Sequence, residues 1–179
     1  MAFLNQKISV KIFWVLFCLT LITMIGMQIT GRPLETDAAP SGIVTFELIG
    51  TLEGAQAIIN SWQNGKIIYA GINMGLDFLF LSLYSITIAL ACLLISKRLP
   101  DNWNLYKNFG LYLAVAVIIA GLLDIFENIA LINMLLGSEN ESLPLLAKWC
   151  AIPKFLIVIV AIFYVISGLF PSLKRTRWL

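Results

Sequence analysis

Four apolar segments, each long enough to cross a lipid bilayer, constrain this chain more than any other feature. They cover about residues 12–30, 68–96, 109–136 and 145–170. A membrane-spanning helix needs about 20 predominantly apolar residues, because the hydrocarbon core is about 30 Å thick. Of all residues, 60% are hydrophobic and only 12% are charged, whereas soluble domains carry about 25% charged residues. The sequence therefore predicts an all-α integral membrane protein, a four-helix bundle in which residues 1–179 form a single domain.

The distribution of lysine and arginine predicts how this bundle is oriented. Eight basic residues are expected on one side of the membrane: Lys7, Lys11, Lys97, Arg98, Lys107, Lys174, Arg175 and Arg177. The opposite side carries three basic residues, Arg32, Lys66 and Lys148, among six acidic ones. Because basic residues are retained in the cytoplasm, we expect both termini to be cytoplasmic. The first apolar segment has no small-residue cleavage site after it, so we expect an uncleaved anchor.

The loop between the first two spans, residues 31–67, contains an amphipathic pattern. Apolar residues recur there every three or four positions: Leu48, Leu52, Ala55, Ile59 and Trp62. This spacing predicts a helix over residues 45–63 that lies on the outer face of the membrane, over the mouth of the bundle. The helix either packs as a simple lid or brings Glu47 or Glu53 into a site.

Polar and ionisable residues interrupt the last three apolar segments at bilayer depth, where a charge costs about 2.5–3.5 kcal/mol to insert. They are Asn73, Asp77, Asp124, Glu127, Asn128 and Lys154. With a rise of about 1.5 Å per residue, Asp77, Glu127 and Lys154 each lie roughly 13 Å from the outer end of their helices. Antiparallel neighbours would bring these groups together. We therefore predict one polar cluster in the outer half of the bundle.

This predicted cluster has three carboxyl groups and a single ammonium group. A bundle of low dielectric constant cannot easily hold all three carboxylates ionised, so at least one is expected to have a strongly raised pKa. One interpretation is structural: Lys154 and its partners fix the register of the helices. The other is an outward-opening cavity that binds a lipid-like or small cationic ligand. The excess of carboxyl groups favours the second interpretation.

Several kinds of chemistry have no support in the sequence. Histidine is absent and the three cysteines stand singly, so neither a metal site nor a cofactor is predicted. A nucleophile paired with a base cannot be assembled, which weighs against an enzyme without deciding the question. The net charge of +2 gives no reason to expect a nucleic-acid partner. Two other functions stay open: an ion or proton pathway, and an accessory or assembly subunit of a membrane complex, as a homo-oligomer or with another membrane protein.

Three stretches of sequence carry a resemblance to known proteins. They are Ala-Pro-Ser-Gly-Ile-Val-Thr-Phe-Glu at 39–47, Leu-Asp-Phe-Leu-Phe at 76–80 and Leu-Asp-Ile-Phe-Glu-Asn at 123–128. Together they resemble a group of small, uncharacterised bacterial inner-membrane proteins with an LD-x-x-EN pattern. This resemblance implies an inner-membrane location among lipids and assigns no activity. The layout of four helices with intramembrane carboxyl groups is also similar to that of EXPERA-type membrane proteins, which implies a cavity for an amphiphilic small molecule.

Overall fold

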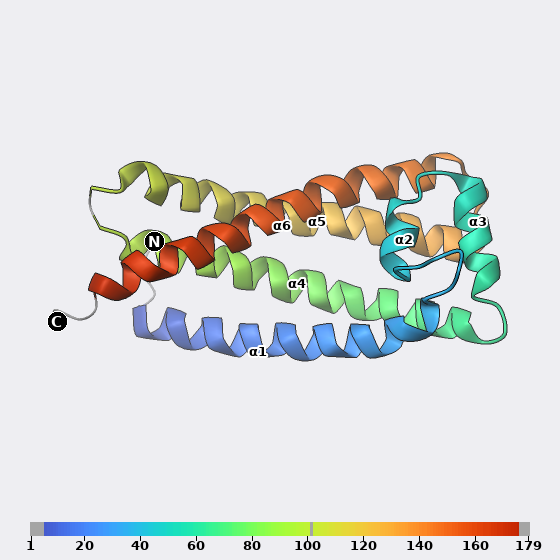
Figure 1. Ribbon diagram of the computed structural model, residues 1–179, viewed down its shortest axis with the longest axis horizontal. Helices are drawn as coiled ribbons and strands as arrows, with labels where there is room; N and C mark the ends of the chain where they lie inside the picture. Colours follow the sequence, from blue (N-terminus) through green and yellow to red (C-terminus); the bar gives the residue numbers. More distant parts are fainter. Residues whose placement is uncertain (1–5, 101, 176–179) are drawn as a thin grey trace.

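The computed structural model describes residues 6–100 and 102–175, and the predicted all-α fold is confirmed (Figure 1). Its elements, in chain order, are α1 (Gln6–Gly31), the short 3-10 helix η1 (Arg32–Leu34), α2 (Ile43–Leu48), α3 (Leu52–Ser61), α4 (Lys66–Arg98), α5 (Asn104–Leu135) and α6 (Ser142–Arg175). Arg177, one of the basic residues behind the predicted orientation, lies outside the described residues.

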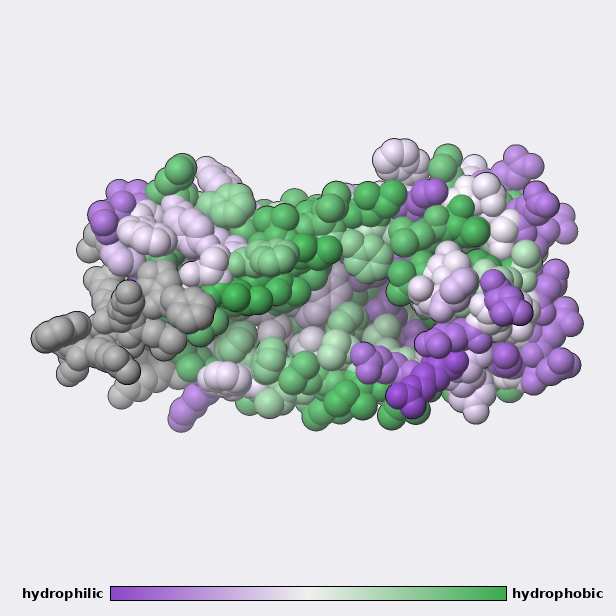
Figure 2. All heavy atoms as spheres, viewed as in Figure 1, coloured by the Kyte–Doolittle hydropathy of each residue, from purple (hydrophilic) through white to green (hydrophobic). Residues whose placement is uncertain are grey.

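Four of these helices, α1, α4, α5 and α6, are long and apolar enough to span a membrane. Large apolar side chains cover their outward surfaces (Figure 2), as expected where lipid replaces water as the solvent. The chain is therefore a multi-pass membrane protein. Each helix begins before its predicted span, α5 ends at Leu135 within its span, and α6 continues through Pro153 without interruption.

The four long helices do not pack equally. Helices α4, α5 and α6 pack closely on one another, whereas α1 packs along α4 at the edge of the bundle (Figure 1). Close approach of α4 and α5 depends on Gly121, where a Cβ atom would lie only 2.9 Å from Cβ of Ser85. Among the described residues, α1 and α6 have no extensive contact. The bundle is consequently open along the line between these two helices.

The predicted single helix over residues 45–63 is wrong, because the chain breaks it into α2 and α3. Gly50 lies between them with a φ of 70°, a left-handed conformation that cannot continue a helix. Thr51 then starts α3 by accepting a hydrogen bond from the backbone N–H of Gly54, 3.3 Å away. The two short helices lie together at one end of the bundle, which we call the cap end (Figure 1).

The side of this cap that packs inward agrees only in part with the predicted apolar stripe, of which Ala55 and Trp62 are buried. Trp62 is fully buried and its Nε1–H donates a hydrogen bond of 2.8 Å to the carbonyl oxygen of Leu34. Ala55 and Ile58 are buried with it, whereas Leu48 is exposed. The cap is therefore fastened to the bundle by a tryptophan anchor.

Two apolar layers fill the interior, one near the cap end and one in the far half. The first surrounds Phe46, Trp62 and Met74, and the second surrounds Cys92 and Val117. Between these two layers lie five of the predicted polar residues: Asp77, Asp124, Glu127, Asn128 and Lys154. Asn73 instead lies beside Met74, at the level of the first layer. The fold thus encloses a polar layer between two apolar ones.

Candidate functional site

Lys154 of α6 is the centre of the polar layer. Its Nζ donates hydrogen bonds of 2.9 Å to Oδ1 of Asp124 and 2.9 Å to Oε1 of Glu127, both on α5. The other oxygen of Asp124, Oδ2, accepts a hydrogen bond of 2.8 Å from the hydroxyl of Tyr84 on α4. These four side chains are buried and hold one another in place. They join α4, α5 and α6, the three closely packed helices.

A second part of the layer is less firmly held. Asp77 of α4 accepts a hydrogen bond of 2.6 Å from Nδ2 of Asn128 and has no ion pair with the lysine. Glu47 reaches the layer from α2, with Oε2 3.9 Å from Nζ of Lys154. That distance is too long for a hydrogen bond, and the buried Oε2 atom has no hydrogen-bond partner. Glu47 therefore forms a long ion pair with Lys154 and no hydrogen bond to it.

The residues in the two parts of the layer also differ in the fraction of their surface that is exposed. Asp77 is 8% exposed and Glu47 is 6% exposed, compared with 2% for Asp124 and 1% for Glu127. The two residues without a hydrogen bond from the lysine thus keep slightly more exposed surface, although Oε2 of Glu47 itself is buried. We call Glu47 and Asp77 the open pair. Four carboxyl groups face a single ammonium group in this layer, one more than the sequence alone predicted.

The structure brings together most, but not all, of the residues predicted to form the site. Lys154, Asp124 and Glu127 form one hydrogen-bonded group, and Asp77 and Asn128 form a second one within the same layer.

Three residues depart from the prediction. Asn73 points away from the layer and donates hydrogen bonds to the carbonyl oxygen of Met27, at 2.7 Å, and to Oγ1 of Thr30, at 2.8 Å. It therefore ties α4 to α1. Glu53 is exposed on α3, so only Glu47 of the two lid candidates enters the layer. Tyr84 was not among the predicted site residues, although its spacing from Asp77, about two helical turns, could have indicated it.

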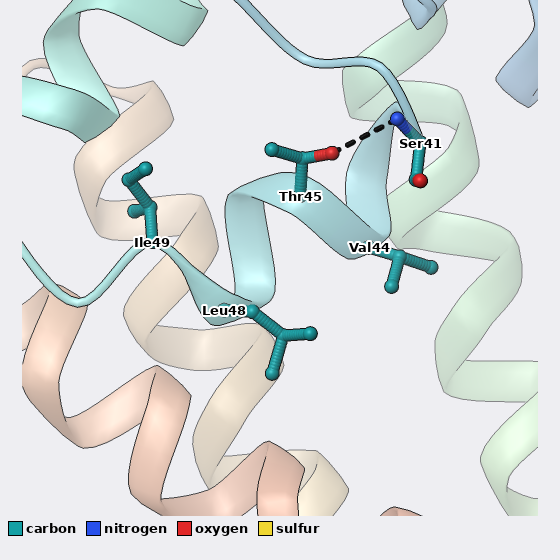
Figure 3. A pocket seen from close by; sticks show the side chains of 5 residues that line it. All are labelled: Ser41, Val44, Thr45, Leu48 and Ile49. Atoms are coloured by element: carbon teal, nitrogen blue, oxygen red, sulfur yellow. Dashed lines mark hydrogen bonds between the residues drawn. The ribbon is translucent and has the colours of Figure 1, made fainter.

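The surface above the layer is hollowed between α6 and α1. Figure 2 shows this hollow with hydrophobic residues along both sides and hydrophilic atoms at its base, over α4. Helix α2 bounds it toward the cap end (Figure 1). Its outward face forms a shallow pocket lined by Ser41, Val44, Thr45, Leu48 and Ile49, with Val44 and Leu48 projecting from one side (Figure 3). The side of the bundle is thus hollowed beside an apolar surface of α2.

Burial raises the pKa of Glu47 well above its ordinary value of 4.5. The positive charge of Lys154 acts in the opposite direction, and repulsion from Glu127, Asp77 and Asp124 adds to the increase. The neutral, protonated form of Glu47 is therefore the favoured one in this position.

This raised pKa predicts that stability decreases as the pH rises. A carboxyl group with a higher pKa in the folded protein binds more protons when folded, so stability is lost from about pH 4.5 upward. Between pH 4.5 and the raised pKa of Glu47, the free energy of unfolding of the wild type should fall by up to about 1.4 kcal/mol per pH unit more than that of Glu47→Gln. Thermal unfolding of both proteins between pH 5 and pH 8 measures the difference. Identical pH dependence of the two proteins would contradict the prediction.

Comparisons with known proteins identify no relative. No family model, curated protein or solved structure matches the chain. Within residues 6–100 and 102–175, moreover, no three histidine, cysteine, aspartate or glutamate residues are arranged so that they could hold a metal ion. The interpretation of the site therefore depends on its own geometry and charge.

Proposed function

We propose that this protein binds a lipid-like or small cationic ligand at its polar layer. In this proposal the chain lies in a bacterial inner membrane with both termini in the cytoplasm, so that the cap end faces outward. The observation that carries the proposal is the imbalance of four buried carboxyl groups against one ammonium group, with Oε2 of Glu47 lacking a hydrogen-bond partner. A positively charged ligand would supply the missing counter-charge.

A purely structural role explains only part of this layer. Fixing the register of three helices requires one charged pair, and Lys154 already has two close partners in Asp124 and Glu127. Glu47 and Asp77 add desolvation cost without a hydrogen bond from the lysine. Such a cost is expected at a binding site, where the charge of the ligand offsets it.

The hollow between α1 and α6 supports entry from the lipid phase. Its sides are hydrophobic and its base is hydrophilic (Figure 2), a combination that fits a ligand with an apolar chain and a charged head. The apolar side chains of Val44 and Leu48 extend this surface along α2. We therefore favour a ligand that reaches the open pair through the side of the bundle.

A continuous ion pathway has less support. In the far half of the bundle, residues such as Cys92, Leu113, Val117 and Ala161 pack into an apolar layer. The buried polar residues of this half, such as Thr87 and Ser96, are uncharged, so a hydrated ion would have to cross it without a charged partner among the described residues. A site that opens on one side of the membrane fits the described residues better than a channel.

Native mass spectrometry of the gently solubilised protein tests the proposal. We expect a small molecule with a positively charged group to copurify with the wild type and to be lost from the double variant Glu47→Gln/Asp77→Asn. The matched control is Glu35→Gln/Asp37→Asn, which makes the same two chemical changes at exposed positions. Thermal unfolding confirms that all three proteins are folded. Folded wild-type protein without such a ligand, or equal retention by both variants, would contradict the proposal.

A further inference from the structure

We propose that Glu47 gives up a proton when the cation binds, so that ligand uptake at the polar layer is coupled to proton release. This inference rests on the proposed function and assigns Glu47 as the specificity-determining group of the open pair. It concerns the exchange of one positive charge for another at a single carboxyl group. Neither the fold nor the ligand class alone requires such an exchange.

The geometry distinguishes Glu47 from the other three carboxyl groups. Asp124 and Glu127 accept hydrogen bonds from Lys154, and Asp77 accepts one from Asn128. Glu47 comes instead from α2, and its buried Oε2 accepts no hydrogen bond. A buried oxygen that has no hydrogen bond and lies 3.9 Å from Nζ of Lys154 is available to a closer partner.

The turns that flank α2 explain how Glu47 reaches this position. Gly42 and Gly50, on either side of the helix, have positive φ values of 56° and 70°. Residues with a side chain rarely adopt such values, whereas glycine adopts them without steric strain. These two turns direct the short helix inward, so that Phe46 and Glu47 are buried while Val44 and Leu48 remain exposed.

The charges around Glu47 determine which form is favoured in the empty site. Lys154 of α6 faces it, together with Asp124 and Glu127 of α5 and Asp77 of α4. The loss of water and the three other carboxyl groups outweigh the attraction of the single ammonium group and raise the pKa of Glu47, which favours its protonated form. An arriving cation reverses this balance, because a carboxylate beside a positive charge is stabilised.

The exchange is a simple acid dissociation. The O–H bond of the Glu47 carboxyl group breaks, the proton leaves to water at the cap end, and the carboxylate forms an ion pair with the cation. The charge of the layer is then the same before and after binding. A buried site that exchanges one positive charge for another avoids the cost of adding an unbalanced charge.

Isothermal titration calorimetry with dodecyltrimethylammonium, a probe with a permanent positive charge, tests this inference. The wild type in lipid nanodiscs is titrated at several pH values between 5 and 8, in two buffers that differ in ionisation enthalpy, with empty nanodiscs as the blank. We expect up to one proton to be released per probe bound where Glu47 is protonated in the empty site. The affinity should rise by up to tenfold per pH unit over the range in which Glu47 is protonated. Glu47→Gln should bind without releasing a proton, whereas Asp77→Asn should bind more weakly and still release one.

The exposed double variant Glu35→Gln/Asp37→Asn should behave as the wild type does. Binding to the wild type without proton release, or unchanged release from Glu47→Gln, would overturn the inference and leave the proposed function standing. Absence of specific binding to the wild type would contradict the proposed function itself. Because the proton count is measured on the wild type, the test does not depend on whether Glu47→Gln folds.

Discussion

Replacing Lys154 with methionine is expected to destabilise the bundle by about 3–5 kcal/mol. Lys154 is 5% exposed and forms ion pairs with Asp124 and Glu127 at 2.9 Å and 2.8 Å. Methionine fills a similar volume, so the principal change is the loss of the one positive charge in the layer. Two carboxylates then stay buried without a counter-charge, which costs much more than the pair contributes when intact.

Thermal or denaturant unfolding in detergent measures this effect, with Lys11→Met as the matched control at an exposed position of α1. Adding Glu127→Gln to Lys154→Met should recover part of the lost stability, because it removes one of the uncompensated charges. If Lys154→Met is as stable as Lys11→Met, the lysine does not hold the layer together.

Replacing Trp62 with alanine should destabilise the cap end by about 3–5 kcal/mol. The indole is fully buried, donates a hydrogen bond to Leu34 and packs edge-on against Phe46 with ring centroids 5.3 Å apart. Phe46 lies next to Glu47 on α2, so loss of the indole also loosens the helix that brings Glu47 into the polar layer. We expect faster hydrogen exchange over residues 43–48 together with the lower stability.

Two further variants show whether the effect of Trp62→Ala is specific to this buried tryptophan or follows from the loss of any tryptophan. Trp62→Phe keeps an aromatic ring and removes the hydrogen bond, so it should cost less, with about 1 kcal/mol from the bond itself. Trp149→Ala removes a tryptophan that is 66% exposed and should change stability little. If Trp62→Ala behaves like Trp149→Ala, the cap is not anchored by this residue.

The depth of the polar layer could be predicted because it depends on quantities that are local to each helix. Apolar length defines where a span begins and ends, and the fixed rise per residue then gives the depth of a residue such as Asp77 or Lys154. Buried charges at one depth in antiparallel neighbours have few partners other than one another. The hydrogen bonds of Lys154 to Asp124 and Glu127 agree with that reasoning.

The cap could not be predicted in the same way. The apolar spacing over residues 45–63 fits one helix, but Gly50 breaks it, and the two short helices then bury different faces. Trp62 packs inward because η1 supplies a carbonyl acceptor at Leu34, a partner that lies 28 positions away in the sequence. Periodicity describes a face of a helix and does not identify what that face meets.

The sequence by itself determined four membrane-spanning helices and a layer of charged residues at one depth, because hydropathy and helical rise belong to each segment alone. Only the tertiary structure decided the partners of those residues. It directs Asn73 to α1, adds Tyr84 to the layer and brings Glu47 rather than Glu53 to Lys154. The physical reason is that the direction of a side chain around its helix axis matters only relative to a neighbour, and the neighbours are set by packing of the whole bundle.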